Sequence, residues 1–151
     1  MSGLGKLLIV DDEKVALKNL EYVLKKEGYE VTATQSGANA LGLLDKQLFD
    51  VILTDLRMEK VDGMQVLKKC RESCPDSEVI MITGQGDMAL AIQSLKCQAS
   101  DYITKPIEDD VLEVALRRAQ DRLDIRRQLR RHTEDLEHLV EEKSRRLIAA
   151  E

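Results

Sequence analysis

The sequence predicts an α/β fold, a doubly wound five-stranded parallel sheet followed by a long C-terminal helix. Short apolar segments alternate with segments of helical periodicity over residues 6–106, which is typical of consecutive βαβ units. Residues 107–151 contain no glycine, proline or aromatic residue, and this composition favours one continuous helix. With 43% hydrophobic and 34% charged residues among 151, the chain is long enough for one compact domain with a charged helical extension.

The expected strands are short, apolar and rich in β-branched residues, as the buried strands of a parallel sheet are. They cover residues 6–10, 29–34, 50–54, 78–82 and 100–103. The expected helices cover residues 14–27, 38–47, 64–73 and 87–97, and the last one begins at residue 108. In the first helix Val15, Leu20 and Leu24 recur at helical spacing, and Gly28 supplies a stop signal.

The composition argues against several classes of protein. A net charge of −5 does not suit a general nucleic-acid coat, which would be basic. Three cysteines give no disulfide framework, and the two histidines lie too far along the chain to complete a zinc site with them. No segment resembles a membrane span or a secretory signal, so we expect a cytoplasmic protein without membrane contact.

Polar side chains follow four of the expected strands. Asp11 and Asp12 follow the first strand, Asp55 the third, Thr83 the fourth and Lys105 the fifth. We expect them to converge, because ligands of doubly wound sheets bind at the carboxyl ends of the strands. Clustered carboxylates repel one another unless a cation neutralises them, and Mg²⁺ suits such hard oxygen ligands. With the hydroxyl and the ammonium, the set predicts a phosphoryl-transfer site in which an Asp carboxylate can act as nucleophile.

Each of these residues has a simpler interpretation when it is taken alone. Asp12 could cap a helix, Asp55 could be a loop carboxylate and Lys105 a solvated charge. Thr83 could be an ordinary cap or sheet residue. Their joint placement at four strand ends favours a site over coincidence.

Four stretches resemble the receiver domain of two-component response regulators, the CheY-like family, across roughly residues 6–123. They are LLIVDDE at 7–13, DVILTDLRM at 50–58 with DG at 62–63, VIMITG at 79–84, and DYITKP at 101–106. The resemblance implies a flavodoxin-like sheet of strand order 2-1-3-4-5. It also implies signal transduction by phosphorylation rather than conventional enzyme activity, although receivers assist their own phosphorylation and dephosphorylation. The phosphoryl donor would be a sensor histidine kinase or a phosphotransfer protein.

The resemblance also implies a role for each matching residue. Asp55 would be the phospho-acceptor, Lys105 would pair with the phosphoryl group and Thr83 would hydrogen-bond to it. The implied Mg²⁺ ligands are Asp12, Asp55 and the Arg57 carbonyl, with Asp11 nearby through water. Together these residues would make Asp55 a magnesium-dependent switch.

Two further positions match the family, and one stretch departs from it. Tyr102 matches the aromatic that changes rotamer on activation, and Pro106 would follow a cis peptide bond. Family members often carry Met-Pro-Gly after the acceptor strand, whereas here Met58 is followed by residues 59–61, Glu-Lys-Val. We expect the loop to be looser or differently shaped, without loss of a phosphoryl ligand.

The last helix is too long to pack fully on a small domain. About 42 helical residues at about 1.5 Å each would span roughly 63 Å, so the far end needs a partner. Its apolar residues recur at spacings of three, four and seven: Leu116, Leu123, Leu129, Leu136, Leu139, Val140 and Leu147. This pattern favours a parallel coiled coil between two chains, although polar residues such as His132 and Lys143 interrupt it. A solvated helix with ion pairs along its length is the alternative.

The receiver resemblance and the uninterrupted last helix divide the chain into a receiver domain, residues 1–123, and a helical extension, residues 124–151. The extension is expected to form a homodimer and to lead to an output domain missing from this chain. Its many arginines, from residue 117 to residue 131, are expected to pair with acidic residues along or across the coil rather than with DNA.

Two other functions compete with a phosphorylation-controlled receiver. A phosphatase or hydrolase with an aspartyl-phosphate intermediate would need a second Asp two residues after Asp55, and that position is Arg57. A phosphorylation-independent dimerisation module would not need the complete set of Asp12, Thr83 and Lys105. Both alternatives are therefore weaker than the receiver hypothesis.

Overall fold

The computed structural model describes residues 5–150, with side chains up to residue 147. Within this range the strands are β1 (Lys6–Val10), β2 (Glu30–Thr34), β3 (Val51–Asp55), β4 (Glu78–Thr83) and β5 (Asp101–Thr104). The helices are α1 (Lys14–Glu27), α2 (Gly37–Lys46), α3 (Gly63–Ser73), α4 (Met88–Lys96) and α5 (Asp109–Ala150). Every expected element is present, and no boundary differs from its expected position by more than one residue.

All neighbouring strands pair in parallel, in the order β2-β1-β3-β4-β5, which confirms the doubly wound fold. Strands β3 and β4 are buried along their whole length at the centre of the sheet. The register places Asp55 beside Ile82 and Thr83 beside Thr104, so the carboxyl ends of β3, β4 and β5 lie level. The residues that follow these strands therefore share one edge of the sheet.

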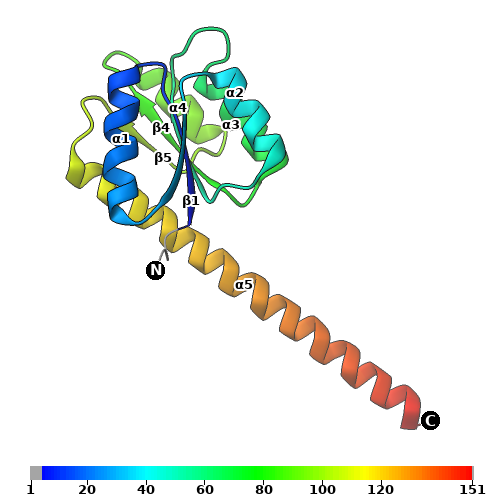
Figure 1. The fold of residues 1–151 in the computed structure, drawn as a ribbon. Helices are drawn as coiled ribbons and strands as arrows, with labels where there is room; N and C mark the ends of the chain where they lie inside the picture. Colours follow the sequence, from blue (N-terminus) through cyan, green and yellow to red (C-terminus); the bar gives the residue numbers. More distant parts are fainter. Residues whose placement is uncertain (1–4, 151) are drawn as a thin grey trace.

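Helices cover both faces of the sheet (Figure 1). Because successive strand side chains point to opposite faces, Leu7 and Ile9 pack with α1 and α5, whereas Leu8 and Val10 pack with α2 and α3. One core lies in each layer, and the two are separated by the sheet.

Helix α5 is 42 residues long and belongs to the domain only over its first half. Leu112, Leu116 and Leu123 are buried against the sheet, whereas every side chain from residue 131 to residue 147 is exposed. Figure 1 shows the second half of the helix extending away from the domain. None of the described helices combines the length and the apolar character that crossing a bilayer requires.

Four arginines of α5 have partners that the sequence did not predict, although Arg127 also pairs along the helix with Asp124 at 4.0 Å. They pair with carboxylates at or just before β3 and β4: Arg122 and Arg126 with Glu78, Arg127 with Asp50, and Arg130 with Asp76. We call these seven residues the arginine clamp. The pairing differs from the expectation because α5 crosses the amino ends of these strands, where the carboxylates lie. Pairs along the helix exist as well, such as Arg145 with Glu141 at 2.9 Å.

Candidate functional site

Three carboxylates gather at the carboxyl end of the sheet. Asp11 and Asp12 come from the loop between β1 and α1, and Asp55 is the last residue of β3. One oxygen from each carboxylate lies within 4.8 Å of the other two. Asp11 and Asp55 are buried, whereas Asp12 is exposed. The fold thus brings together the acidic residues that the sequence predicted for the site.

Asp11 is held in place by the backbone but leaves one oxygen available. Its N–H donates to the Thr34 carbonyl at 3.2 Å, and its Oδ1 accepts from the Glu13 N–H at 2.9 Å. Its Oδ2 is buried and accepts no hydrogen bond from the part of the chain that the structure describes. Burial raises the pKa of Asp11, and the charge of Asp55 adds to the shift, although the Glu13 N–H and Lys105 oppose it. A buried carboxylate oxygen without a donor fits a bound cation.

Lys105 supplies the positive charge of the site. Its Nζ lies 3.0 Å from Asp55 Oδ2, 3.6 Å from Asp11 Oδ2 and 3.8 Å from Glu13 Oε1. Burial works against the ammonium, but the hydrogen bond to Asp55 and the neighbouring carboxylates outweigh it and raise the pKa of Lys105 above its usual value. Lys105 is therefore charged at neutral pH and close enough to Asp55 to hold an anion formed there.

The other predicted residues lie on β4, on β5 and in the loop after β5. Thr83 ends β4 with its side chain buried, and its carbonyl accepts from the Lys105 N–H at 2.7 Å. Tyr102 is half-buried on β5 and packs against the core beneath α2 and α3. The peptide bond between Lys105 and Pro106 is cis.

Arg57 has a side-chain contact that sequence reasoning missed. Its N–H donates to Asp55 Oδ1 at 3.4 Å, and its Nε pairs at 2.6 Å with Asp87, a buried residue that precedes α4. The pair joins the loop after Asp55 to the loop after Thr83. The two residues are separated by 30 positions, and no spacing pattern in the sequence links them.

A groove of about 560 Å³ opens beside Lys105. Its walls come from α1 and from the start of α5, and they are mainly apolar. Apolar lining residues include Ala16, Leu20, Val23, Ile107 and Leu112, and Asn19, Gln85 and Asp109 are among the polar ones. Glu13 and Lys105 lie at the end that faces the carboxylates, so the groove leads to the site.

The family model of the response regulator receiver domain matches residues 7–117. The chain belongs to this family. The receiver is 35% identical to the alginate biosynthesis transcriptional regulatory protein AlgB of Pseudomonas aeruginosa over 136 residues, which cover 90% of this chain and 29% of AlgB. The chain thus spans less than a third of the length of this curated relative.

Solved structures agree with this assignment. A response regulator receiver domain protein from Clostridium thermocellum superposes with a TM-score of 0.77 at 33% identity, over 81% of this chain and 98% of that one. A chain described as an adenylate cyclase from Rhodopirellula baltica gives a TM-score of 0.80 at 28% identity, over 85% and 96% of the two chains. The receiver fold, and the place of this chain in two-component signalling, rest on these likenesses together with the family match.

Proposed function

We propose that this chain is a receiver whose Asp55 accepts a phosphoryl group in a Mg²⁺-dependent reaction. The observation that carries the proposal is the position of Lys105 Nζ, 3.0 Å from Asp55 Oδ2, beside the carboxylate cluster. Asp12, Asp55 and the Arg57 carbonyl would hold the ion, with Asp11 nearby through water. The buried Asp11 oxygen that has no described donor fits this use.

The chemistry follows from the side chains in place. Asp55 Oδ attacks the phosphorus of a phosphohistidine, the new P–O bond replaces the P–N bond, and the imidazole leaves. Lys105 neutralises the phosphoryl oxygens, and the Thr83 hydroxyl donates to them. Mg²⁺ supplies charge neutralisation when it is bound. Attack of water on the same phosphorus restores Asp55, so the receiver assists both its phosphorylation and its dephosphorylation without being a conventional enzyme.

The donor would be a sensor histidine kinase or a phosphotransfer protein. We assign its docking surface to the apolar groove between α1 and α5, because that groove opens beside Lys105 and Glu13. A donor helix bound there would bring its phosphohistidine to Asp55 without opening the domain. The reaction would take place in the cytoplasm and needs no membrane contact.

Phosphorylation would change the surface formed by α4, β5 and α5. Thr83 would move toward the phosphoryl group, and Tyr102 would turn inward. Five large apolar side chains are already exposed on α4 and on the first two turns of α5: Met88, Ile92, Leu95, Val111 and Val114. Exposed apolar residues gathered on neighbouring elements suit a switched contact surface.

We propose further that two chains dimerise through the extension, residues 124–151, which continues from the receiver domain, residues 1–123. The large apolar residues that are exposed on the extension recur at helical spacing and form the apolar stripe of α5: Ile125, Leu129, Leu136, Leu139, Val140 and Leu147. The opposite side carries charged residues such as Glu134, Glu141 and Arg145. An amphipathic helix that leaves the domain is expected to bury its apolar side against a second copy.

The extension would lead to an output domain that lies outside this chain. AlgB is named a transcriptional regulatory protein, and most of its length has no counterpart here. We place DNA contact, if the full protein makes any, in that output domain, because the clamp arginines are occupied by carboxylates of the receiver.

Phosphorylation of Asp55 can be tested directly. The chain is incubated with a small-molecule phosphodonor and Mg²⁺, and the covalent phosphate is measured by mass spectrometry. We expect labelling of the wild type, loss of labelling in Asp55→Asn or with EDTA, and normal labelling in the control Asp45→Asn, whose side chain pairs with Lys69 on the surface. Full labelling of Asp55→Asn would overturn the proposal. Turnover of a small phosphate ester would instead favour the hydrolase alternative.

A further inference from the structure

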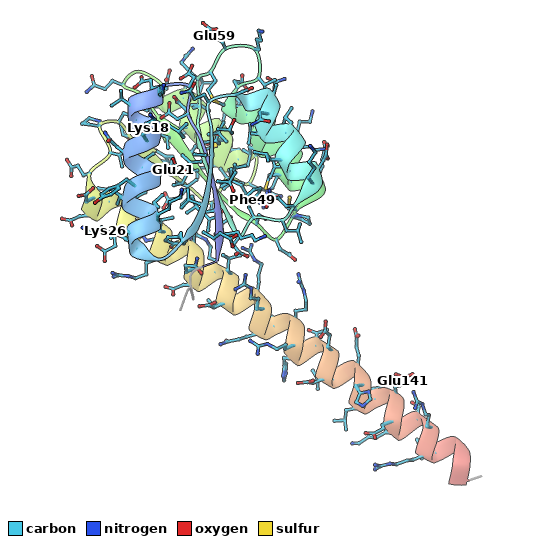
Figure 2. The ribbon with its side chains drawn as sticks, in the orientation of Figure 1. Lys18, Glu21, Lys26, Phe49, Glu59 and Glu141 are labelled. Atoms are coloured by element: carbon cyan, nitrogen blue, oxygen red, sulfur yellow. The ribbon has the colours of Figure 1, made fainter. Side chains whose placement is uncertain are left out.

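The four arginines of the arginine clamp lie outside the part of the chain that matches the family model, whereas their carboxylate partners lie inside it. The receiver match ends at residue 117, whereas the four clamp arginines lie between residues 122 and 130. The clamp also lies at the opposite pole from the phosphoryl site. Figure 2 shows Glu59, in the loop that follows the acceptor strand, at the end of the domain opposite to the point where α5 leaves.

Glu78 is the centre of the clamp. It is only 2% exposed, and its two carboxylate oxygens are divided between two arginines, with Oε1 bound by Arg122 and Oε2 by Arg126. Burial raises the pKa of Glu78. The hydrogen bonds from both arginines lower it by more, so the pKa lies below its usual value. Glu78 is therefore ionised, and release of the arginines would leave a buried charge without a partner.

Two outer pairs fix the helix at further points. Arg127 binds Asp50 at 2.7 Å, and the other oxygen of Asp50 accepts from the Lys6 N–H at 2.8 Å. Arg130 pairs with Asp76 in the segment before β4. The clamp thus connects α5 to the starts of three neighbouring strands, β1, β3 and β4, over more than two helical turns.

Strand β4 joins the clamp to the phosphoryl site. Glu78 is its first residue and Thr83 its last, and all six of its residues are buried. The strand is hydrogen-bonded to β3 on one side and β5 on the other, so its two ends are linked by a short, fully supported segment.

We propose that the arginine clamp is the joint through which the state of the phosphoryl site sets the direction of the second half of α5. This inference rests on the proposed function and identifies Glu78, Arg122 and Arg126 as positioning residues. Displacement of β4 at Thr83 reaches Glu78, and the two arginines pass it to the helix. Residues 131–147 extend roughly 25 Å beyond the clamp. Tilting the helix axis by about 10° at the clamp therefore moves the far end of this segment by about 4 Å.

The proposal can be tested by measuring the distance between spin labels in the full chain. One label is placed on the exposed Cys97 and the other on Ser144→Cys in the exposed part of α5. The spin-labelled chain is diluted into chain without spin labels, so that only distances within one molecule are measured. The distance is measured with Mg²⁺ alone and with Mg²⁺ plus beryllofluoride. Phosphorylation of Asp55 is measured separately, on aliquots that receive the phosphodonor and Mg²⁺ without beryllofluoride.

We expect a narrow distance distribution that shifts with beryllofluoride in the wild type. In Arg122→Gln/Arg126→Gln the distribution should broaden and the shift should be lost, with Asp55 labelling retained. The matched control, Arg117→Gln/Arg145→Gln, removes two exposed arginines whose partners in the described part of the chain lie along the helix, and it should behave like the wild type. A narrow distance distribution that still shifts with beryllofluoride in Arg122→Gln/Arg126→Gln would overturn the proposal.

The exposed outer pair of Arg130 with Asp76 provides a second test that leaves Glu78, Arg122 and Arg126 in the chain. Arg130→Asp places like charges opposite each other and should broaden the distribution, whereas Asp76→Arg/Arg130→Asp should restore it. Failure of the swap to restore the wild-type distribution contradicts the proposal. Absence of Asp55 labelling in the wild type would contradict the proposed function, while an absent distance shift despite labelling would contradict the joint alone.

Discussion

Gly63 lies where the loop after the acceptor strand returns to the sheet. A Cβ at this position would lie 2.3 Å from the Asp55 carbonyl oxygen and 2.9 Å from Leu56 Cα, and backbone atoms cannot move aside cheaply. We expect Gly63→Ala to lower the free energy of unfolding by about 1–3 kcal/mol. It should also slow phosphorylation of Asp55, because the acceptor itself is displaced.

The matched control for Gly63→Ala is Gly42→Ala in α2. A Cβ at Gly42 meets nothing within 4 Å, so alanine should stabilise the helix by up to about 1 kcal/mol. Urea unfolding and the phosphorylation rate check both variants. Equal effects of the two substitutions would contradict the account of Gly63.

Glu78 makes the stability of the fold depend on pH. Burial raises its pKa, but Arg122 and Arg126 lower it more, so the folded value lies below the ordinary 4.5. The contribution of Glu78 to the free energy of unfolding is therefore complete at a pH above its pKa in the unfolded chain. It is lost as the pH falls through the lower pKa that Glu78 has in the folded protein. We expect Glu78→Gln to cost about 2–4 kcal/mol at neutral pH, since both arginines lose a buried charged partner.

Urea unfolding at neutral and acidic pH checks this prediction. The cost of Glu78→Gln should shrink as the solution is acidified, because the wild-type carboxyl is then protonated as well. Glu141→Gln, which removes an exposed carboxylate paired along α5, should leave both the stability and its pH dependence unchanged. A cost that is the same at every pH would contradict the assigned role of the charge.

At the residue scale, the sequence was sufficient to predict which groups meet. Asp11, Asp55 and Lys105 lie together because each ends or follows a strand, and parallel strands end at the same edge. The pair of Arg57 with Asp87 could not be predicted in this way, since it depends on where two loops approach each other. The functional roles of the site residues remain predictions for the phosphorylation experiment.

Among the helices, α3 begins with a reciprocal cap. Asp62 Oδ1 accepts from the Gln65 N–H, and Gln65 Oε1 accepts from the Asp62 N–H, both at 3.0 Å. We expect Asp62→Ala to lower the free energy of unfolding by about 1 kcal/mol, because the Gln65 N–H at the start of the helix loses its acceptor. Glu59→Ala in the exposed loop before α3 is the control and should have little effect. Equal urea midpoints for the wild type and Asp62→Ala would contradict the importance of the cap.

The pattern of apolar residues predicted the boundaries of each helix in the sequence well. It was less successful in predicting which side of the helix is buried. Val15 was expected on the apolar side of α1, yet it is 74% exposed, whereas Leu17, Leu20 and Leu24 are buried. Val15 precedes Leu17 by two residues, a rotation of about 200° around the helix, and therefore faces away from the sheet. The pairing of the clamp arginines was missed for a related reason, because the sequence does not show which strands lie beneath α5.

At the scale of the whole molecule, the proposed dimerisation depends on the apolar stripe of α5. We expect Leu136→Glu to convert the dimer into a monomer, because it places a charge in the middle of the buried seam. His138→Glu is the matched control, since it introduces the same side chain about 200° further around the helix. Light scattering gives the molar mass of each variant.

The same measurement with Mg²⁺ and beryllofluoride shows whether the phosphoryl site controls assembly. A change in molar mass that is absent in Asp55→Asn means that phosphorylation controls the dimer itself. An unchanged dimer means that the two helices stay paired and only their geometry changes. A monomeric wild type under all conditions would contradict dimerisation through α5.

The position of the clamp at the opposite pole from Asp55 has a consequence for the order of events in signalling. A phosphoryl donor that docks beside Lys105 and a second helix that pairs with the apolar stripe occupy separate regions of the surface. Under the proposed function, neither partner would have to leave before the other binds. Phosphorylation within an assembled dimer would then need no dissociation and reassembly.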